Sequence, residues 1–145
     1  MSDYSTALMK SIYDYMLGCP LLKDGTFSVD GLPDNPVSYG IDYVPSANGT
    51  IKQYIDGSSV RIFNFVFASR EFFDLETVQN LMNCTFYDEF AQWIESQDKA
   101  ENFPTLGKGM YPRHLRVSLP GYLYSSDGES ARYQIQLQLT YFKEA

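Results

Sequence analysis

The one histidine of the chain, His114, is the first candidate for chemistry, because imidazole is the most common general base in enzymes. It lies in the segment Pro112–Leu115, at the start of an expected strand. A serine nucleophile would need this base, but the sequence has no G-x-S-x-G elbow, and Ser58 and Ser59 follow an expected turn instead of leading into a helix. We expect His114 to be a surface or capping residue, and an enzyme that depends on it is the least favoured function.

Carboxylates, thiols and glycine-rich loops also give no recognisable catalytic pattern. The acidic pairs are Asp88 with Glu89, Glu95 with Asp98, and Asp42 with Asp56. The first four carboxylates mostly fall off the apolar stripe of an expected long helix, which favours a solvated helix face. Cys19 and Cys84 are expected to be two reduced thiols, and their spacing gives no zinc ligand pattern. Gly107–Gly109 lacks the first glycine and the Ser or Thr of a phosphate-binding loop. Because none of these groups forms a recognisable site, we predict no catalytic residue, metal or cofactor.

Length and charge narrow the class of protein. The chain has 145 residues, which is the size of one domain, and we expect residues 1–145 to form a single one. Its 11 Lys and Arg residues stand against 18 Asp and Glu residues, and the net charge of -7 opposes binding to a phosphate backbone. The N-terminus lacks the basic segment that begins a signal peptide, and the sequence contains no run of about 18 apolar residues. We therefore expect a protein that is neither exported nor bound to a membrane.

The last strand shows the clearest pattern. Residues 131 to 142 alternate so that one face carries Ala131, Tyr133, Ile135, Leu137, Leu139 and Tyr141. The other face carries Arg132, Gln134, Gln136, Gln138 and Thr140. This alternation predicts a strand with one packed face and one face for contact or solvent.

The other segments predict elements in a fixed order. They are a helix from Asp3 to Gly18, a short strand at 26–29, a strand at 39–43, a hairpin of 50–55 and 59–68 around Asp56–Gly57, a long helix capped by Asp74, and a strand at 115–119 that Pro120–Gly121 interrupts. The second hairpin arm is apolar on both faces, so it requires a helix or another subunit as cover. We predict an α+β fold with a mixed, mainly antiparallel sheet flanked by an N-terminal helix and a long central helix.

Aromatic residues are in excess, because 12 Tyr, 10 Phe and 1 Trp make up 16% of the chain. Two interpretations stay open. The aromatic side chains either complete a small core with tyrosines at its rim, or form contacts between subunits, where tyrosine is a frequent residue.

Several segments resemble one protein family. They are KSIYDYM at 10–16, DGSSVR at 56–61, FVFASRE at 65–71, and GYL at 121–123 with ARYQIQ at 131–136. They resemble minor capsid proteins encoded in the tail-module region of long-tailed bacteriophages and prophages of Gram-positive hosts. The resemblance implies an α+β fold and a structural role in the virion, as a tail terminator or tail-completion factor.

This resemblance also implies the partners. A ring of subunits, typically about six, would cap the tail-tube protein and join it to the head-connector protein. Such a protein assembles in the host cytoplasm, ends in the virion tail, and has no enzymatic activity. DNA would pass through the ring without sequence-specific binding, helped by the acidic charge. The alternative is a module that binds a small ligand in an aromatic pocket under the sheet.

A ring requires heterologous contacts, in which one patch of a subunit meets a different patch of the next. Flexible loops beside strands are where such contacts commonly form. We therefore expect interface residues at Asn48, Gly49, Thr50 and Lys52, at Asp56, Gly57 and Ser58 of the hairpin turn, and at Tyr111 and Arg113.

Overall fold

A computed structural model describes residues 3–22, 26–29, 32, 37–44, 49–72, 77–126 and 129–145. Its elements are α1 (Asp3–Met16), β1 (Thr26–Val29), β2 (Ser38–Tyr43), β3 (Thr50–Gln53), β4 (Ser59–Phe72), α2 (Thr77–Lys99), β5 (Met110–Ser126) and β6 (Ser130–Lys143). This order confirms the predicted α+β class. Two residues with predicted roles, Asn48 and the helix cap Asp74, lie outside the described ranges.

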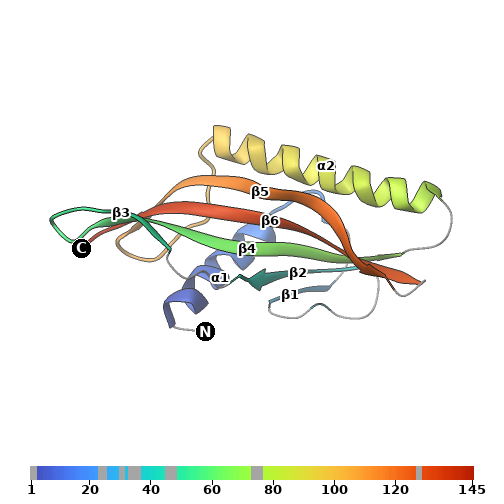
Figure 1. Ribbon diagram of the computed structural model, residues 1–145, viewed down its shortest axis with the longest axis horizontal. Helices are drawn as coiled ribbons and strands as arrows, with labels where there is room; N and C mark the ends of the chain where they lie inside the picture. Colours follow the sequence, from blue (N-terminus) through green and yellow to red (C-terminus); the bar gives the residue numbers. More distant parts are fainter. Residues whose placement is uncertain are drawn as a thin grey trace.

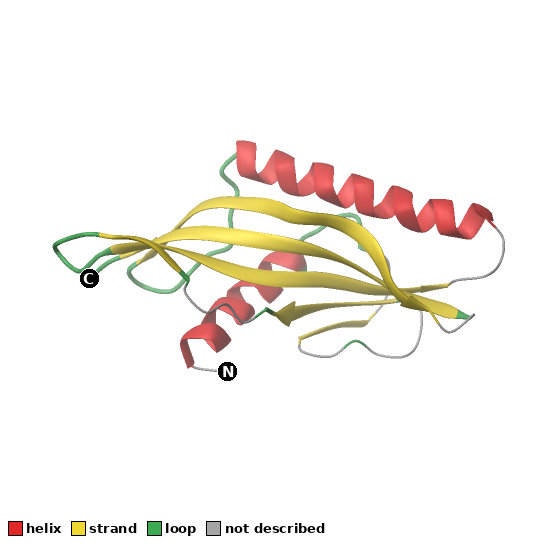
Figure 2. Ribbon diagram, viewed as in Figure 1, coloured by secondary structure: helices red, strands yellow, loops and turns green. Residues whose placement is uncertain are grey.

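The strands form one mixed sheet in the order β1-β2-β4-β6-β5, and β3 pairs with β4 beside this path (Figure 1). Among the described strands, β1 and β2 run parallel to each other, while the other pairs are antiparallel. β4 and β6 pair along their whole lengths, from Ser59 opposite Lys143 to Phe72 opposite Ser130. The long central strands therefore carry the β3–β4 hairpin beyond both helices at one end of the molecule (Figure 2).

The alternation of β6 is confirmed. Its six apolar side chains, from Ala131 to Tyr141, are each at most 4% exposed, whereas Gln136, Gln138 and Thr140 on the opposite face are partly exposed. The buried face belongs to one continuous hydrophobic core with residues of β2, β4, β5 and both helices. The period of two in the sequence therefore identified the core face correctly.

Both helices pack on this same face of the sheet. Ile12 of α1 and Phe90 of α2 belong to one core cluster, and the rings of Tyr15 and Trp93 link the two helices at 5.7 Å. Val66 and Ala68 point to the opposite face of β4 and are also buried, yet they lie outside that cluster. The described helices thus cover one face of β4. Because Val66 and Ala68 on its other face are already buried within the single chain, the expectation that a helix or another subunit must cover that face is wrong for these two residues.

Strand β5 differs from its prediction, because Pro120 and Gly121 do not end it. The strand continues from Met110 to Ser126, with register shifts against β6, one of them between Leu119 and Tyr122. Proline is tolerated here because β5 is an edge strand and its outer side needs no N–H donor. A β-bulge therefore replaces the predicted break.

The two cysteines and the two helices were also the subject of predictions, that the thiols are reduced and that the chain does not cross a membrane. Cys19 is a buried free thiol, and burial raises its pKa, whereas Cys84 is an exposed free thiol on α2. Neither α1 nor α2, as far as they are described, is long and apolar enough to cross a membrane.

Candidate functional site

Two predicted interface residues, Tyr111 and Arg113, meet around Phe142 of β6 at one end of the sheet. Thr50 and Lys52 lie in β3, Ser58 is buried, and Asn48 lies outside the described residues. The Phe142 ring contacts Tyr54 after β3 and Tyr111 of β5, each at a centroid distance of 6.3 Å. The guanidinium of Arg113 lies over the same ring at 5.3 Å. We call this region, made of residues 49–61, 107–113 and 142–144, the hairpin end. No role was predicted for Phe142, although it is the one aromatic residue that continues the polar stripe of Arg132 to Thr140.

The turn at the tip of the hairpin end is well defined. The Asp56 carboxylate accepts hydrogen bonds from the backbone N–H of Ser58, at 2.9 Å, and from its hydroxyl. These bonds hold the pKa of Asp56 below its usual value. Gly57 has a φ of 92°, which confirms the predicted Asp56–Gly57 turn. Ile55 is consequently held at the tip with its side chain fully exposed.

Positive charge concentrates at the hairpin end of an otherwise acidic chain. The cations are Lys52, Arg61, Lys108, Arg113 and Lys143. Asp56 and Glu144 are the carboxylates of the same region. Lys52 lies over the Tyr54 ring at 5.2 Å, so the rings of Tyr54 and Phe142 each carry a cation.

Most exposed large apolar side chains of the described residues gather toward the ends of the long strands, with Leu17 and Val29 as exceptions. At the hairpin end they are Ile51, Tyr54, Ile55 and Tyr111; near the opposite end they are Phe72, Leu123 and Tyr124, with Leu119 midway along β5. Ile51 is 58% exposed and Tyr124 is 60% exposed. Large apolar side chains grouped in this way mark contact surfaces more often than isolated ones do.

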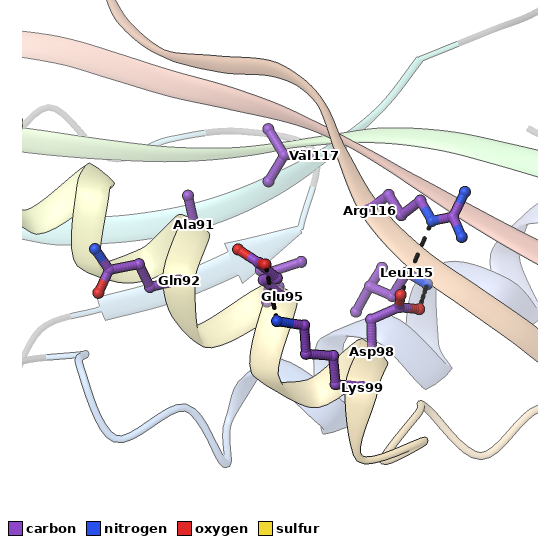
Figure 3. A pocket seen from close by; sticks show the side chains of 9 residues that line it. Ala91, Gln92, Glu95, Asp98, Lys99, Leu115, Arg116 and Val117 are labelled. Atoms are coloured by element: carbon purple, nitrogen blue, oxygen red, sulfur yellow. Dashed lines mark hydrogen bonds and ion pairs between the residues drawn. The ribbon is translucent and has the colours of Figure 1, made fainter.

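A groove of about 450 Å³ runs between α2 and the edge strand β5 (Figure 3). Its apolar lining comes from Ala91, Ile94, Leu115 and Val117, and its polar lining from Gln92, Glu95, Asp98, Lys99 and Arg116. Glu95 and Lys99 form an exposed ion pair at 3.2 Å, one helical turn apart. We call this feature the α2–β5 groove.

Asp98 closes one end of the groove by bonding to the edge of the sheet. Its carboxylate accepts the backbone N–H of Leu115 at 3.0 Å and lies 3.3 Å from Nδ1 of His114. Arg116 Nε is 3.9 Å away. The Asp98 side chain is 19% exposed and accepts a hydrogen bond from a backbone N–H at the edge of the sheet, so the expectation of a solvated Asp98 is wrong. The sequence does not indicate which backbone N–H this carboxylate meets.

The same contacts give His114 a partner but no nucleophile. A base held by a carboxylate is one half of a catalytic arrangement, which also requires a hydroxyl or thiol in reach. The described contacts of the imidazole are with Asp98 and Arg116, and neither side chain is a nucleophile. Within the described ranges, no three His, Cys, Asp or Glu residues are grouped so as to hold a metal ion.

Comparisons with protein-family models and with curated proteins found no match for this chain. The resemblance of its segments to phage structural proteins therefore stays a hypothesis. The surfaces described above provide the physical basis for a function.

Replacing Asp98 with alanine is expected to lower the free energy of unfolding by about 1 to 3 kcal/mol, because the Leu115 N–H loses its acceptor at a partly buried edge. Asp98→Asn keeps an acceptor and should lose less. The matched control is Glu95→Gln, which removes an exposed ion pair and should cost about 0.5 kcal/mol or less. Urea unfolding monitored by circular dichroism measures all three, and equal losses for Asp98→Ala and Glu95→Gln would contradict the role of Asp98.

Proposed function

We propose that this protein is a virion structural protein of a phage or prophage, a tail terminator or tail-completion factor that forms a ring at the head-proximal end of the tail tube. Its partners are other copies of itself, the tail-tube protein and the head-connector protein. The work of the protein is assembly, and it makes or breaks no covalent bond.

The observation that supports this proposal best is the separation of two unlike contact surfaces. The hairpin end is basic and carries Ile51 and Ile55, whereas the opposite end carries Phe72 and Tyr124. Because the two surfaces differ and lie at opposite ends of the strands, a contact between one surface and the other on a neighbouring copy is heterologous. Repeated contacts of this heterologous kind close into a ring or extend into a filament.

The sheet gives further support. The described helices cover one face, while the other face presents Gln136, Gln138 and Asn64 beside buried Val66. Gln138 donates a hydrogen bond to Asn64 at 3.2 Å, so the polar groups of this face are ordered across strands. An ordered polar face of this kind suits a neighbouring protein better than it suits a catalytic site.

The alternative of an aromatic ligand pocket has less support. The rings of Phe67 and Phe90 stack at 4.4 Å, and Phe67 and Tyr39 stack at 5.9 Å, so aromatic side chains under the sheet pack against one another. The α2–β5 groove has the volume of a ligand site, but its lining contains no aromatic side chain.

The test is addition to tail tubes. The purified protein is mixed with tubes polymerised from the tail-tube protein of the phage or prophage that encodes it, and the tubes are examined by negative-stain electron microscopy. We expect a ring at one end of each tube. Bare tube ends, together with a protein that stays monomeric at high concentration, would contradict the proposal.

A further inference from the structure

We infer that the hairpin end binds the phosphate backbone of duplex DNA without reading its sequence. This inference goes beyond the proposed function, because the binding surface lies within one copy of the chain and is complete without assembly. Contacts to phosphate oxygens carry no sequence information, so any duplex long enough to cover the surface is a ligand.

Three exposed cations without a described carboxylate partner lie at the hairpin end. Lys10 of α1 and Lys99 of α2 form ion pairs, at 2.9 and 3.2 Å, with carboxylates one helical turn away. Among the residues that the structure describes, no carboxylate lies within 4.0 Å of the charged groups of Lys52, Lys108 and Arg113. Their charge is therefore available to neutralise the phosphates of a ligand.

Two of these cations are held over aromatic rings. The Arg113 guanidinium lies over the Phe142 ring at 5.3 Å. The Lys52 ammonium lies over the Tyr54 ring at 5.2 Å, and the two rings contact each other at 6.3 Å. Stacking uses the flat face of a guanidinium, so the N–H groups at its edge stay available to phosphate oxygens. The four side chains therefore form one row that presents a positive charge at each end.

This row lies on the open side of the sheet, which is the side opposite the helices. Phe142 alternates with the buried Tyr141 of the core, so its side chain points away from α1 and α2. The same side of β6 continues with Thr140, Gln138 and Gln136, which are partly exposed and uncharged. Amide and hydroxyl groups donate hydrogen bonds to phosphate and sugar oxygens. Cations followed by neutral donors along one strand suit a linear ligand of uniform negative charge.

The two carboxylates of the hairpin end are engaged within it. Asp56 accepts hydrogen bonds from Ser58. Glu144 accepts a hydrogen bond from the Tyr111 hydroxyl at 2.8 Å. Five cations stand against these two carboxylates, so the hairpin end keeps a positive net charge although the chain as a whole is acidic. A phosphate group is therefore attracted to this part of the surface.

Acidic side chains lie on the other side of the sheet. The exposed carboxylates of the described helix surfaces are Asp14 of α1 and Asp88, Glu89 and Glu95 of α2. Phosphates are repelled there, so the field of the whole protein orients DNA toward the open side. The net charge of -7 thus opposes binding at the helices and leaves the hairpin end as the surface for DNA.

Fluorescence anisotropy of a labelled duplex of mixed sequence, over a series of salt concentrations, tests the inference. The variant with Lys52→Gln and Arg113→Gln should bind at least about tenfold more weakly at low salt, because two phosphate contacts are lost. The slope of log K against log salt concentration should become shallower by about two. The matched control, Lys10→Gln with Lys99→Gln, removes the same charge from exposed helix positions and should change binding about twofold or less.

Circular dichroism verifies that each variant is folded. No binding by the wild-type chain at low salt, or equal losses in the two double variants, would overturn the inference, because binding would then be absent or would follow total charge. Displacement of the duplex by polyglutamate at an equal concentration of charges would overturn it in favour of an acidic protein partner, and displacement by inorganic phosphate would overturn it in favour of a small-anion site.

The inference and the proposed function fail separately. A chain that caps tail tubes without binding DNA would overturn this inference alone. A chain that binds DNA as expected and leaves tube ends bare would contradict the proposed function alone.

Discussion

Replacing Phe67 with alanine is expected to lower the free energy of unfolding by about 3 to 5 kcal/mol. Phe67 lies in the middle of β4 and is fully buried. Its ring contacts five other rings, those of Phe27, Tyr39, Phe86, Tyr87 and Phe90. The truncation leaves a cavity that the surrounding rings, fixed on α2 and on the sheet, cannot fill. A loss of this size is a large part of the total stability of a small domain.

Strand β4 also contains the matched control. Phe72 is the same residue type in the same strand, but it is 55% exposed. Phe72→Ala should therefore change the free energy of unfolding by about 1 kcal/mol or less. Urea unfolding followed by near-ultraviolet circular dichroism, at a concentration where the chain is monomeric, compares the two variants. Similar losses for both would show that the cluster around Phe67 is not the core of the protein.

Gly121→Val is expected to destabilise the protein by about 2 to 4 kcal/mol, through a clash where α2 lies closest to β5. A Cβ atom added at Gly121 would lie 2.6 Å from Cβ of Tyr87 and 2.7 Å from its ring. The Tyr87 side chain cannot move aside easily, because its buried hydroxyl donates to the Tyr133 carbonyl at 3.0 Å and lies 2.6 Å from Ser69 Oγ. Burial also raises the pKa of Tyr87 well above its usual range.

The control for this substitution is Gly18→Ala, after the end of α1. A Cβ atom at Gly18 would lie 3.4 Å from the Tyr15 carbonyl oxygen, which is ordinary van der Waals contact. This variant should change the free energy of unfolding by about 1 kcal/mol or less. Thermal unfolding by differential scanning calorimetry compares the two glycines. A Gly121→Val protein as stable as the wild type would mean that α2 does not approach β5 at this point.

Local patterns explain which parts of the fold could be predicted. The core face of β6 follows from a period of two that needs no knowledge of its neighbours. The hairpin turn follows from Asp56–Gly57, whose backbone preference is also local. Residues on either side of this turn were predicted as interface residues because they flank strands. In the structure Tyr54, beside the turn, contacts Phe142, which also contacts the predicted Tyr111 and Arg113.

The remaining features depend on contacts between distant segments. Nothing near Asp98 in the sequence indicates that the N–H of Leu115 will reach it, because that contact requires α2 to lie along the edge of the sheet. In the sequence, Pro120–Gly121 is typical of the end of a strand. In the structure, a glycine is required at position 121 because the Tyr87 side chain of α2 lies against it. One signal was available for Asp98, since it lies four residues after Ile94 and therefore on the same helix face as a core residue.

The central claim, that this protein acts by binding other copies of itself through unlike surfaces, is tested most directly by multi-angle light scattering over a concentration series. The expected result is a mass that rises to a fixed multiple of the single chain. Ile55→Asp, which places a charge at the tip of the hairpin end, should keep the fold and lose this rise. A wild-type mass equal to one chain at every concentration, with and without the tail-tube protein, would contradict the account.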